Sequence, residues 1–383
     1  MRISPTPFPA PERALLTPPD AVEGNLLGRG ILSAISVDHR PTQFQALLAR
    51  AILDAMIGQT YDTATFAPIE PDEFAAGLAQ RTEAFRTRIL QSMILGALVL
   101  RPLPIEVADR VAEFARAMSI DDGMLTVAHD FAAGQLGLAA VDFDRNGYTA
   151  NWSPERTVAL HAGGLADAWA TSVHDPELAM RWCSLEALGH DTLGRRLWEF
   201  YRARGFEFPG SPGSAPPLLA QHDWVHVLAD YGTKVESELE VFGFIARAND
   251  DPRAFSLLAM VVSLFETGYL AHGAGLFDAF PGQLSHEGMA VRLADGMRRG
   301  AMSHGLDGAP DVDRLEVDWF SLADRPLTEL QAMFNVVPKA VGAVAAGSCG
   351  PWEPGGISEY QFATGRAAAA AAGREYDAYG ARP

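Results

Sequence analysis

Cysteine is almost absent from this sequence, which has only Cys183 and Cys349 among its 383 residues. Two cysteines so far apart exclude a disulfide framework and a CxxC metal knuckle. No apolar run reaches the roughly 18–20 residues of a membrane span, and the proline-rich start has no apolar region typical of a signal peptide. We therefore expect a cytoplasmic protein whose contact with a membrane, where it occurs, is peripheral.

Positive charge is also scarce, with 30 Lys and Arg against 48 Asp and Glu and a net charge of −18. Binding to phosphate backbones needs clustered Lys and Arg, so this balance argues against a nucleic-acid partner. About 48% of the residues are apolar, which is enough for a packed core. The length allows two or three domains, and it leaves a homo-oligomer open.

Strand patterns are rare, whereas apolar residues recur at spacings of three and four. The sequence therefore predicts an all-α protein, a multi-helix bundle with a helical N-terminal extension. We expect helices over residues 42–58, 71–98, 104–118, 121–140, 155–171, 176–186, 191–204, 218–230, 234–248, 252–271 and 284–303, and a short one after Pro326.

Four parts follow from the distribution of turn residues. Residues 1–40 are rich in Pro and Gly and read as an irregular segment, and 41–150 as a helical N-terminal unit. The turn-rich stretch 142–156 separates this unit from a helical domain over 155–337. Residues 338–383 form a C-terminal tail, whose RAAAAAAGREYDAYG stretch is either a terminal helix or a fraying end.

One stretch carries the chemistry, QHDWVHVLADYGTKVESELEVFGF at residues 221–244. His222 and His226 are four residues apart, which places both imidazoles on one face of a helix, as a divalent metal requires. Asp223 either binds the metal directly or orients a histidine ligand from behind. A His-x-x-x-His pair alone is more often structural, so the neighbouring carboxylates decide the interpretation.

The helix that carries the histidines is expected to end at Tyr231-Gly232, where Gly232 can take the left-handed conformation. Thr233 followed by Glu236 fits a capping box at the start of the next helix. An antiparallel pair of helices joined there brings later carboxylates back across from the histidines.

Glu238 lies 12 residues beyond His226 and one turn into the second helix, so it is the expected partner of the histidines. Glu240 points about 200° around that helix and is expected elsewhere. Imidazole and carboxylate ligands together suit zinc, and also iron, cobalt or manganese.

The spacing of His222, Asp223, His226 and Glu238 resembles the HDxxH-x11-E signature of the fourth coenzyme-Q (ubiquinone) biosynthesis protein family. Three flanking stretches also resemble that family, at residues 185–209, 290–306 and 316–336. The resemblance covers roughly residues 175–337. It implies an all-α protein that binds a divalent metal, usually zinc, through these four residues.

The resemblance further implies association with membranes, binding of prenyl-tailed lipids, and organisation of other biosynthetic enzymes. It also implies a link to oxidative removal of the ring carboxyl from a prenylated 4-hydroxybenzoate. The chain departs from the family pattern at Ala229-Asp230, Lys234 and Ser237, and about 170 residues precede the similar region. These departures leave another quinone or a phenolic natural product open as the substrate.

Two further regions are candidates for substrate binding. Helix 252–271 is apolar nearly all round, so it is either a central core helix or one wall of a prenyl-tail tunnel. The tunnel interpretation assigns the lining to Met260, Leu264 and Phe265. Arg298 and Arg299 either grip a substrate carboxylate or phosphate, or form a solvated helix end.

Two functions of different classes follow. The first is a metal-dependent enzyme that decarboxylates or hydroxylates a prenylated or phenolic ring, with proton transfer by Asp223 or Glu238. The second is a scaffold that binds prenyl lipid without catalysis, in which the metal pins two helices. No glycine-rich dinucleotide fingerprint is present, so a flavin or nicotinamide cofactor is not expected.

Overall fold

The computed structural model describes residues 19–38, 40–58, 61–100, 103–121, 174–212, 217–248, 287–306 and 312–383, and the single residues Leu125, Ser214, Leu258 and Gly308. In this part of the chain every regular element is a helix, and strand-type pairing is limited to isolated bridges. The expected all-α fold is confirmed. Among the described residues no helix is long and apolar enough to cross a bilayer.

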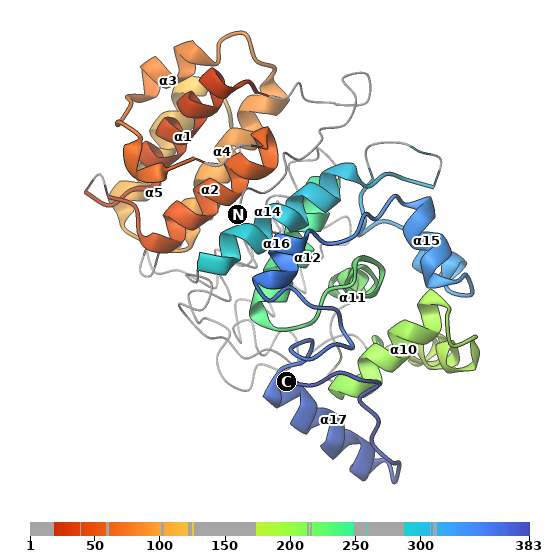
Figure 1. Cartoon of the computed structure of the whole chain (residues 1–383). Helices are drawn as coiled ribbons and strands as arrows, with labels where there is room; N and C mark the ends of the chain where they lie inside the picture. The colour runs from red at the N-terminus through yellow and green to blue at the C-terminus, as the bar shows by residue number, and fades with distance from the viewer. Residues whose placement is uncertain are drawn as a thin grey trace.

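The N-terminal unit is a group of packed helices, shown in red to yellow in Figure 1. Its helices are α1 (Ala21–Ile35), α2 (Gln43–Ile57), α3 (Pro71–Gly77), α4 (Glu83–Leu98) and α5 (Ile105–Met118), with a 3₁₀ turn at Thr63–Thr65. A capping box at Thr42 begins α2, and left-handed Gly58 ends it. Helix α2 is buried along most of its length because it packs against α1, α4 and α14.

Helix α1 corrects the prediction that residues 1–40 are irregular. The Asp20 carboxylate caps it by accepting hydrogen bonds from the Val22 and Glu23 amides. Its glycines are sites of close packing rather than loop signals. A Cβ on Gly28 would lie 2.3 Å from the Phe66 ring. The neighbouring aromatic side chain therefore occupies the space that a larger residue in α1 would need.

The predicted helix over 71–98 is two helices, α3 and α4. Thr82 begins α4 by accepting a hydrogen bond from the Phe85 amide, and the chain turns between the two helices at residues 78–82. The periodicity of apolar residues continues across the turn because both helices face the same core, which is why the pattern reads as one helix.

The second half of the chain agrees closely with the predicted helices where it is described. These are α9 (Pro176–Cys183), α10 (Leu193–Arg204), α11 (Pro217–Ala229), α12 (Val235–Ala248), α14 (Glu287–Met302) and α15 (Leu327–Met333), with 3₁₀ turns at Ser184–Ala187 and Trp319–Leu322. Helices α16 (Val341–Ala345) and α17 (Glu359–Ala371) lie in the predicted tail, and α16 was not predicted. Thr192 caps α10 as expected. The predicted helices over 121–140, 155–171 and 252–271 fall wholly or almost wholly outside the described residues.

Helices α12 and α14 are in close backbone contact. A Cβ on Gly300 would lie 2.1 Å from the carbonyl oxygen of Phe244, and one on Gly296 would lie 2.7 Å from that of Glu240. Helix α14 also packs on α2, so the N-terminal unit lies directly against the helix that supports α12 (Figure 1). The domain boundary at 142–156 lies outside the described residues and stays a prediction.

The C-terminal tail contains an ordered helix, the first of the two predicted alternatives. A capping box at Ser358 begins α17, which packs along α10 (Figure 1). The segment before α17 reaches the buried Arg204 of α10, whose Nη2 donates to the carbonyl oxygens of Pro351 and Gly356 at 2.9 and 2.8 Å. The tail is thus fixed to the helices around the histidines.

Candidate metal centre

Helices α11 and α12 are joined by a short turn at residues 230–234. The left-handed residue in this turn is Asp230, with φ of 62°, and not Gly232 as predicted. Gly232 serves a different purpose, because a Cβ there would lie 2.7 Å from the Cα of Gly356. The turn is therefore built to accept the C-terminal segment at close range.

The predicted capping box at Thr233 and Glu236 is also wrong. Helix α12 begins at Val235, one residue too late for Thr233 to be its cap. The buried Thr233 hydroxyl instead donates to Oε1 of Gln361 at 2.6 Å and accepts from Nε of Arg204 at 2.8 Å. The Thr233 hydroxyl, which the local sequence assigned to a helix cap, is thus hydrogen-bonded by residues distant in sequence.

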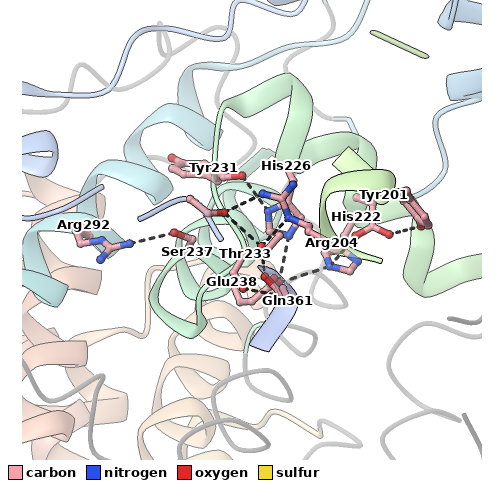
Figure 2. A network of polar contacts seen from close by, with 12 residues as sticks. Tyr201, Arg204, His222, His226, Tyr231, Thr233, Ser237, Glu238, Arg292 and Gln361 are labelled. Atoms are coloured by element: carbon pink, nitrogen blue, oxygen red, sulfur yellow. Dashed lines mark hydrogen bonds and ion pairs between the residues drawn. The ribbon is translucent and has the colours of Figure 1, made fainter. Parts of the chain in front are cut away.

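Three of the predicted ligands meet as expected across this turn. His222, His226 and Glu238 each offer one ligand atom, and these atoms all lie within 4.8 Å of one another. Oε2 of Glu238 is 3.2 Å from Nε2 of His226 and 3.5 Å from Nε2 of His222. All three residues are at most 3% exposed. Figure 2 shows their side chains converging between α11 and α12.

The hydrogen bond made by the second ring nitrogen of His226, Nδ1, indicates what the cluster of His222, His226 and Glu238 can bind. Nδ1 lies 3.3 Å from the carbonyl oxygen of Tyr231, which can only accept a hydrogen bond. If His226 is neutral and donates from Nδ1, its Nε2 carries a lone pair and can only accept a hydrogen bond. This lone pair then faces the Glu238 carboxylate, which is also an acceptor, so two acceptors oppose each other. Either a proton on Nε2, which makes His226 an imidazolium, or a metal ion between these atoms resolves the conflict, and a backbone carbonyl behind a histidine is the usual arrangement for a metal ligand.

Glu238 is suited to the same cation. Burial acts to raise its pKa, but the charges of the two imidazoles and hydrogen bonds from them outweigh this and lower the pKa to about 2. Its other oxygen, Oε1, is buried and has no hydrogen-bond partner among the described residues. An ionised carboxylate with an unpartnered oxygen, beside two imidazoles, fits a divalent metal.

Asp223 lies at the edge of this cluster. Its Oδ1 is 3.5 Å from Nε2 of His222, while its Oδ2 accepts a hydrogen bond from the Tyr201 hydroxyl at 2.5 Å. Burial raises the pKa of Asp223, and the nearby histidines and the Tyr201 hydrogen bond oppose that rise. The structure thus brings three predicted ligands together and places the fourth beside them.

Two aromatic rings hold the imidazoles in place. The Phe242 ring stacks on His222, with centroids 4.9 Å apart and an interplanar angle of 26°. The Phe200 ring lies 5.6 Å from that of His226. Sequence reasoning missed these two residues and Tyr201, and the only signal for them is the aromatic-rich stretch of α10 and α12.

The two predicted substrate arginines make their contacts outside the three ligand residues. Arg298 pairs with Asp295 at 2.7 Å and donates to the carbonyl of Pro338. Arg299 is only 2% exposed, so it is not part of a solvated helix end. It donates to the carbonyl of Val337 and lies 4.8 Å from the Tyr231 ring centroid. Met260, Leu264 and Phe265 lie outside the described residues.

Comparison with known proteins gives one structural likeness. No protein-family model and no curated protein matches the chain. Among solved structures, it matches the crystal structure of a protein from Nostoc punctiforme PCC 73102 described as a ubiquinone biosynthesis protein. The two share 17% sequence identity and a TM-score of 0.28, over 66% of this chain and 98% of that one. The functional argument therefore rests on the residues of this chain.

Proposed function

We propose that this protein holds one divalent metal through His222, His226 and Glu238, with Asp223 as the fourth ligand, and acts on a phenolic or prenylated aromatic ring. Zinc suits this ligand set best, and iron, cobalt or manganese are the alternatives. The reaction class is oxidative decarboxylation or hydroxylation of a quinone precursor or a related natural product, with dioxygen or a separate cofactor as the oxidant. The HDxxH-x11-E spacing supports this class, because it resembles that of the fourth coenzyme-Q biosynthesis family.

The observation that carries the proposal is the meeting of three buried ligand atoms within 4.8 Å of one another. A buried carboxylate facing two imidazole nitrogens is costly to leave without a cation. The hydrogen bond between Nδ1 of His226 and the Tyr231 carbonyl favours the tautomer that leaves Nε2 free to bind a metal.

Different residues of the site have different roles in the proposed reaction. The two histidines and Glu238 bind the metal, and their aromatic neighbours exclude water from it. A divalent metal with an open position supplies a Lewis acid that polarises a phenolate or carboxylate. Asp223 and Glu238 are the groups placed to hold or accept a proton beside the substrate.

A second candidate function is a scaffold that binds prenyl lipid and other biosynthetic enzymes without catalysis. The burial of the ligands favours it, because the four residues are between 0 and 5% exposed and four protein ligands can close a metal shell. The mixture of imidazole and carboxylate ligands favours the enzyme, since structural zinc sites usually contain cysteine.

Elemental analysis tests the metal. We expect about one divalent ion per chain in the native protein and none in the His222→Ala plus His226→Ala variant. His190→Ala is the matched control. The His190 side chain is 87% exposed, and its carboxylate neighbour is Glu199, which is not one of the proposed ligands. Full metal occupancy in the double variant would reject the site.

Native mass spectrometry of the purified protein separates the two functions. A bound aromatic precursor together with the metal supports an enzyme. A prenyl lipid with no aromatic head group, in a protein that converts no phenolic acid, supports the scaffold.

A further inference from the structure

Tyr201 lies directly behind Asp223, on a neighbouring helix. Its hydroxyl, at the end of a side chain that is 1% exposed, donates to Oδ2 of Asp223 at 2.5 Å. Tyr201 belongs to α10 and Asp223 to α11. The hydrogen bond therefore links the helix that carries the histidines to a helix that supplies none of the four predicted ligands.

The Tyr201 ring is held on several sides. It stacks on Phe208, with centroids 5.4 Å apart and an interplanar angle of 14°. Trp182 lies 5.1 Å away and Phe206 lies 5.5 Å away, both by centroid distance. A ring packed in this way keeps its hydroxyl in one place, so the donor is already positioned before any ligand arrives.

The bond determines which oxygen of Asp223 faces the histidines. Oδ2 is occupied by the tyrosine, and Oδ1 lies 3.5 Å from Nε2 of His222. The same nitrogen of His222 is 3.5 Å from Oε2 of Glu238. With Tyr201 in place, the carboxylate of Asp223 presents one defined oxygen toward His222, one of the three residues that meet at the centre.

We propose that Tyr201 is a positioning residue that fixes Asp223 as a one-oxygen ligand of the metal. This role rests on the proposed metal site. The hydrogen bond of the Tyr201 hydroxyl goes to Asp223, so its effect on the metal is expected to pass through that carboxylate. Hydrogen-bond partners behind metal ligands commonly change metal affinity by about 10- to 100-fold.

Cobalt(II) binding to the metal-depleted full-length protein is the test. Tyr201→Phe keeps the ring and removes the hydroxyl, and we expect about tenfold weaker cobalt affinity and a shifted visible spectrum. Tyr376→Phe is the control, because it removes a different tyrosine hydrogen bond, to the carbonyl of Ala203 at 2.8 Å. This control is expected to leave both readouts unchanged.

A double-mutant cycle shows that the effect passes through Asp223. In an Asp223→Ala background, which leaves the Tyr201 hydroxyl no side-chain oxygen at position 223 to bond, Tyr201→Phe is expected to cause no further loss of cobalt affinity. An equal loss in both backgrounds indicates general loosening and overturns the proposal. If Tyr201→Phe does not fold, 3-fluorotyrosine at position 201 keeps the shape and strengthens the donor. An unchanged spectrum would then overturn the proposal.

The controls also separate this proposal from the metal site itself. If the parent protein binds no cobalt, both the site and the role of Tyr201 fail. If the parent binds cobalt and Tyr201→Phe has the same affinity and spectrum, only the role of Tyr201 fails.

Discussion

Glu238 and Glu240 are two residues apart on α12 and belong to separate buried networks. Oε2 of Glu238 is 3.2 Å from Nε2 of His226, whereas Oε2 of Glu240 is 2.6 Å from Nη2 of Arg292 on α14. Both carboxylates are 1% exposed. Helix α12 thus presents one carboxylate to the two histidines and the other to α14, which packs against it.

This separation gives a matched pair of variants. Glu238→Gln is expected to weaken metal binding at least tenfold, because it removes a charged ligand and keeps the shape. Glu240→Gln is expected to retain the metal and to destabilise the fold by about 3 kcal/mol, because Arg292 loses its buried partner. Metal titration and urea denaturation of both variants are the measurements.

The same pair tests catalysis in the host. Under the proposed function, Glu238→Gln accumulates a carboxylated or unhydroxylated aromatic precursor, and Glu240→Gln does not while it stays folded. Normal product at the normal rate from a folded, metal-loaded Glu238→Gln protein is the result that rejects catalysis through Glu238.

A pH-dependent effect is expected at Asp54 on α2. Burial raises the pKa of this carboxyl to about 7, although nearby Arg50 opposes the rise. The folded state then keeps its proton up to about pH 7, whereas the unfolded chain releases it near its ordinary value of about 3.9. The folded state therefore binds more protons in this interval, so its stability falls as the pH rises through it.

Asp54→Asn removes this dependence. Its stabilising effect is expected to be larger at pH 8 than at pH 5.5, by about 1–2 kcal/mol. Urea denaturation at the two pH values measures it, with Glu113→Gln on the exposed face of α5 as the control. An equal effect at both pH values contradicts the prediction.

The close contact of α12 and α14 predicts a severe effect of a single methyl group. Gly300→Ala places a Cβ 2.1 Å from the Phe244 carbonyl oxygen, so the helices must separate, at a cost of about 2–3 kcal/mol. Gly342→Ala in α16 meets nothing nearer than 3.6 Å and is expected to be neutral or slightly stabilising. Equal stability of the two variants, measured by urea denaturation, contradicts the close contact.

Gln361 predicts a local effect on the turn that joins the metal helices. Its side chain accepts from the Thr233 hydroxyl at 2.6 Å and donates to the Thr233 carbonyl at 3.3 Å. Gln361→Ala is expected to speed hydrogen exchange at residues 230–234 by about tenfold, with α2 unchanged. Gln331→Ala is the control, because Gln331 bonds the carbonyl of Leu228 instead. Unchanged exchange in the turn indicates that the tail does not restrain it.

The local sequence pattern was sufficient to predict most of the described helices and the meeting of Glu238 with the two histidines. Helical periodicity predicted α2, α5, α10 and α12 to within one or two residues. The four-residue spacing of the histidines and the antiparallel turn predicted that Glu238 meets them and that Glu240 does not. These features depend on geometry within one helix or between two consecutive helices.

The missed features depend on contacts that are distant in sequence. Tyr201 lies 22 residues from Asp223, and several aromatic residues of α10 were equally plausible neighbours from sequence alone. Thr233 bonds Gln361 across 128 residues, so a capping box was the natural local interpretation. The glycines of α1 read as turn signals because the aromatic rings that press against them come from later segments.

The bonds from Gln361, Gly356 and Cys349 to the α11–α12 turn have a consequence for the order of biosynthesis. The amides of Gly232 and Thr233 donate to the carbonyls of Cys349 and Gly356, which are translated more than 100 residues after the turn itself. A nascent chain therefore carries both histidines and Glu238 well before it has the segment that fixes their turn. If the proposed metal site is correct, stable metal loading is expected only after residues 349–361 have been synthesised.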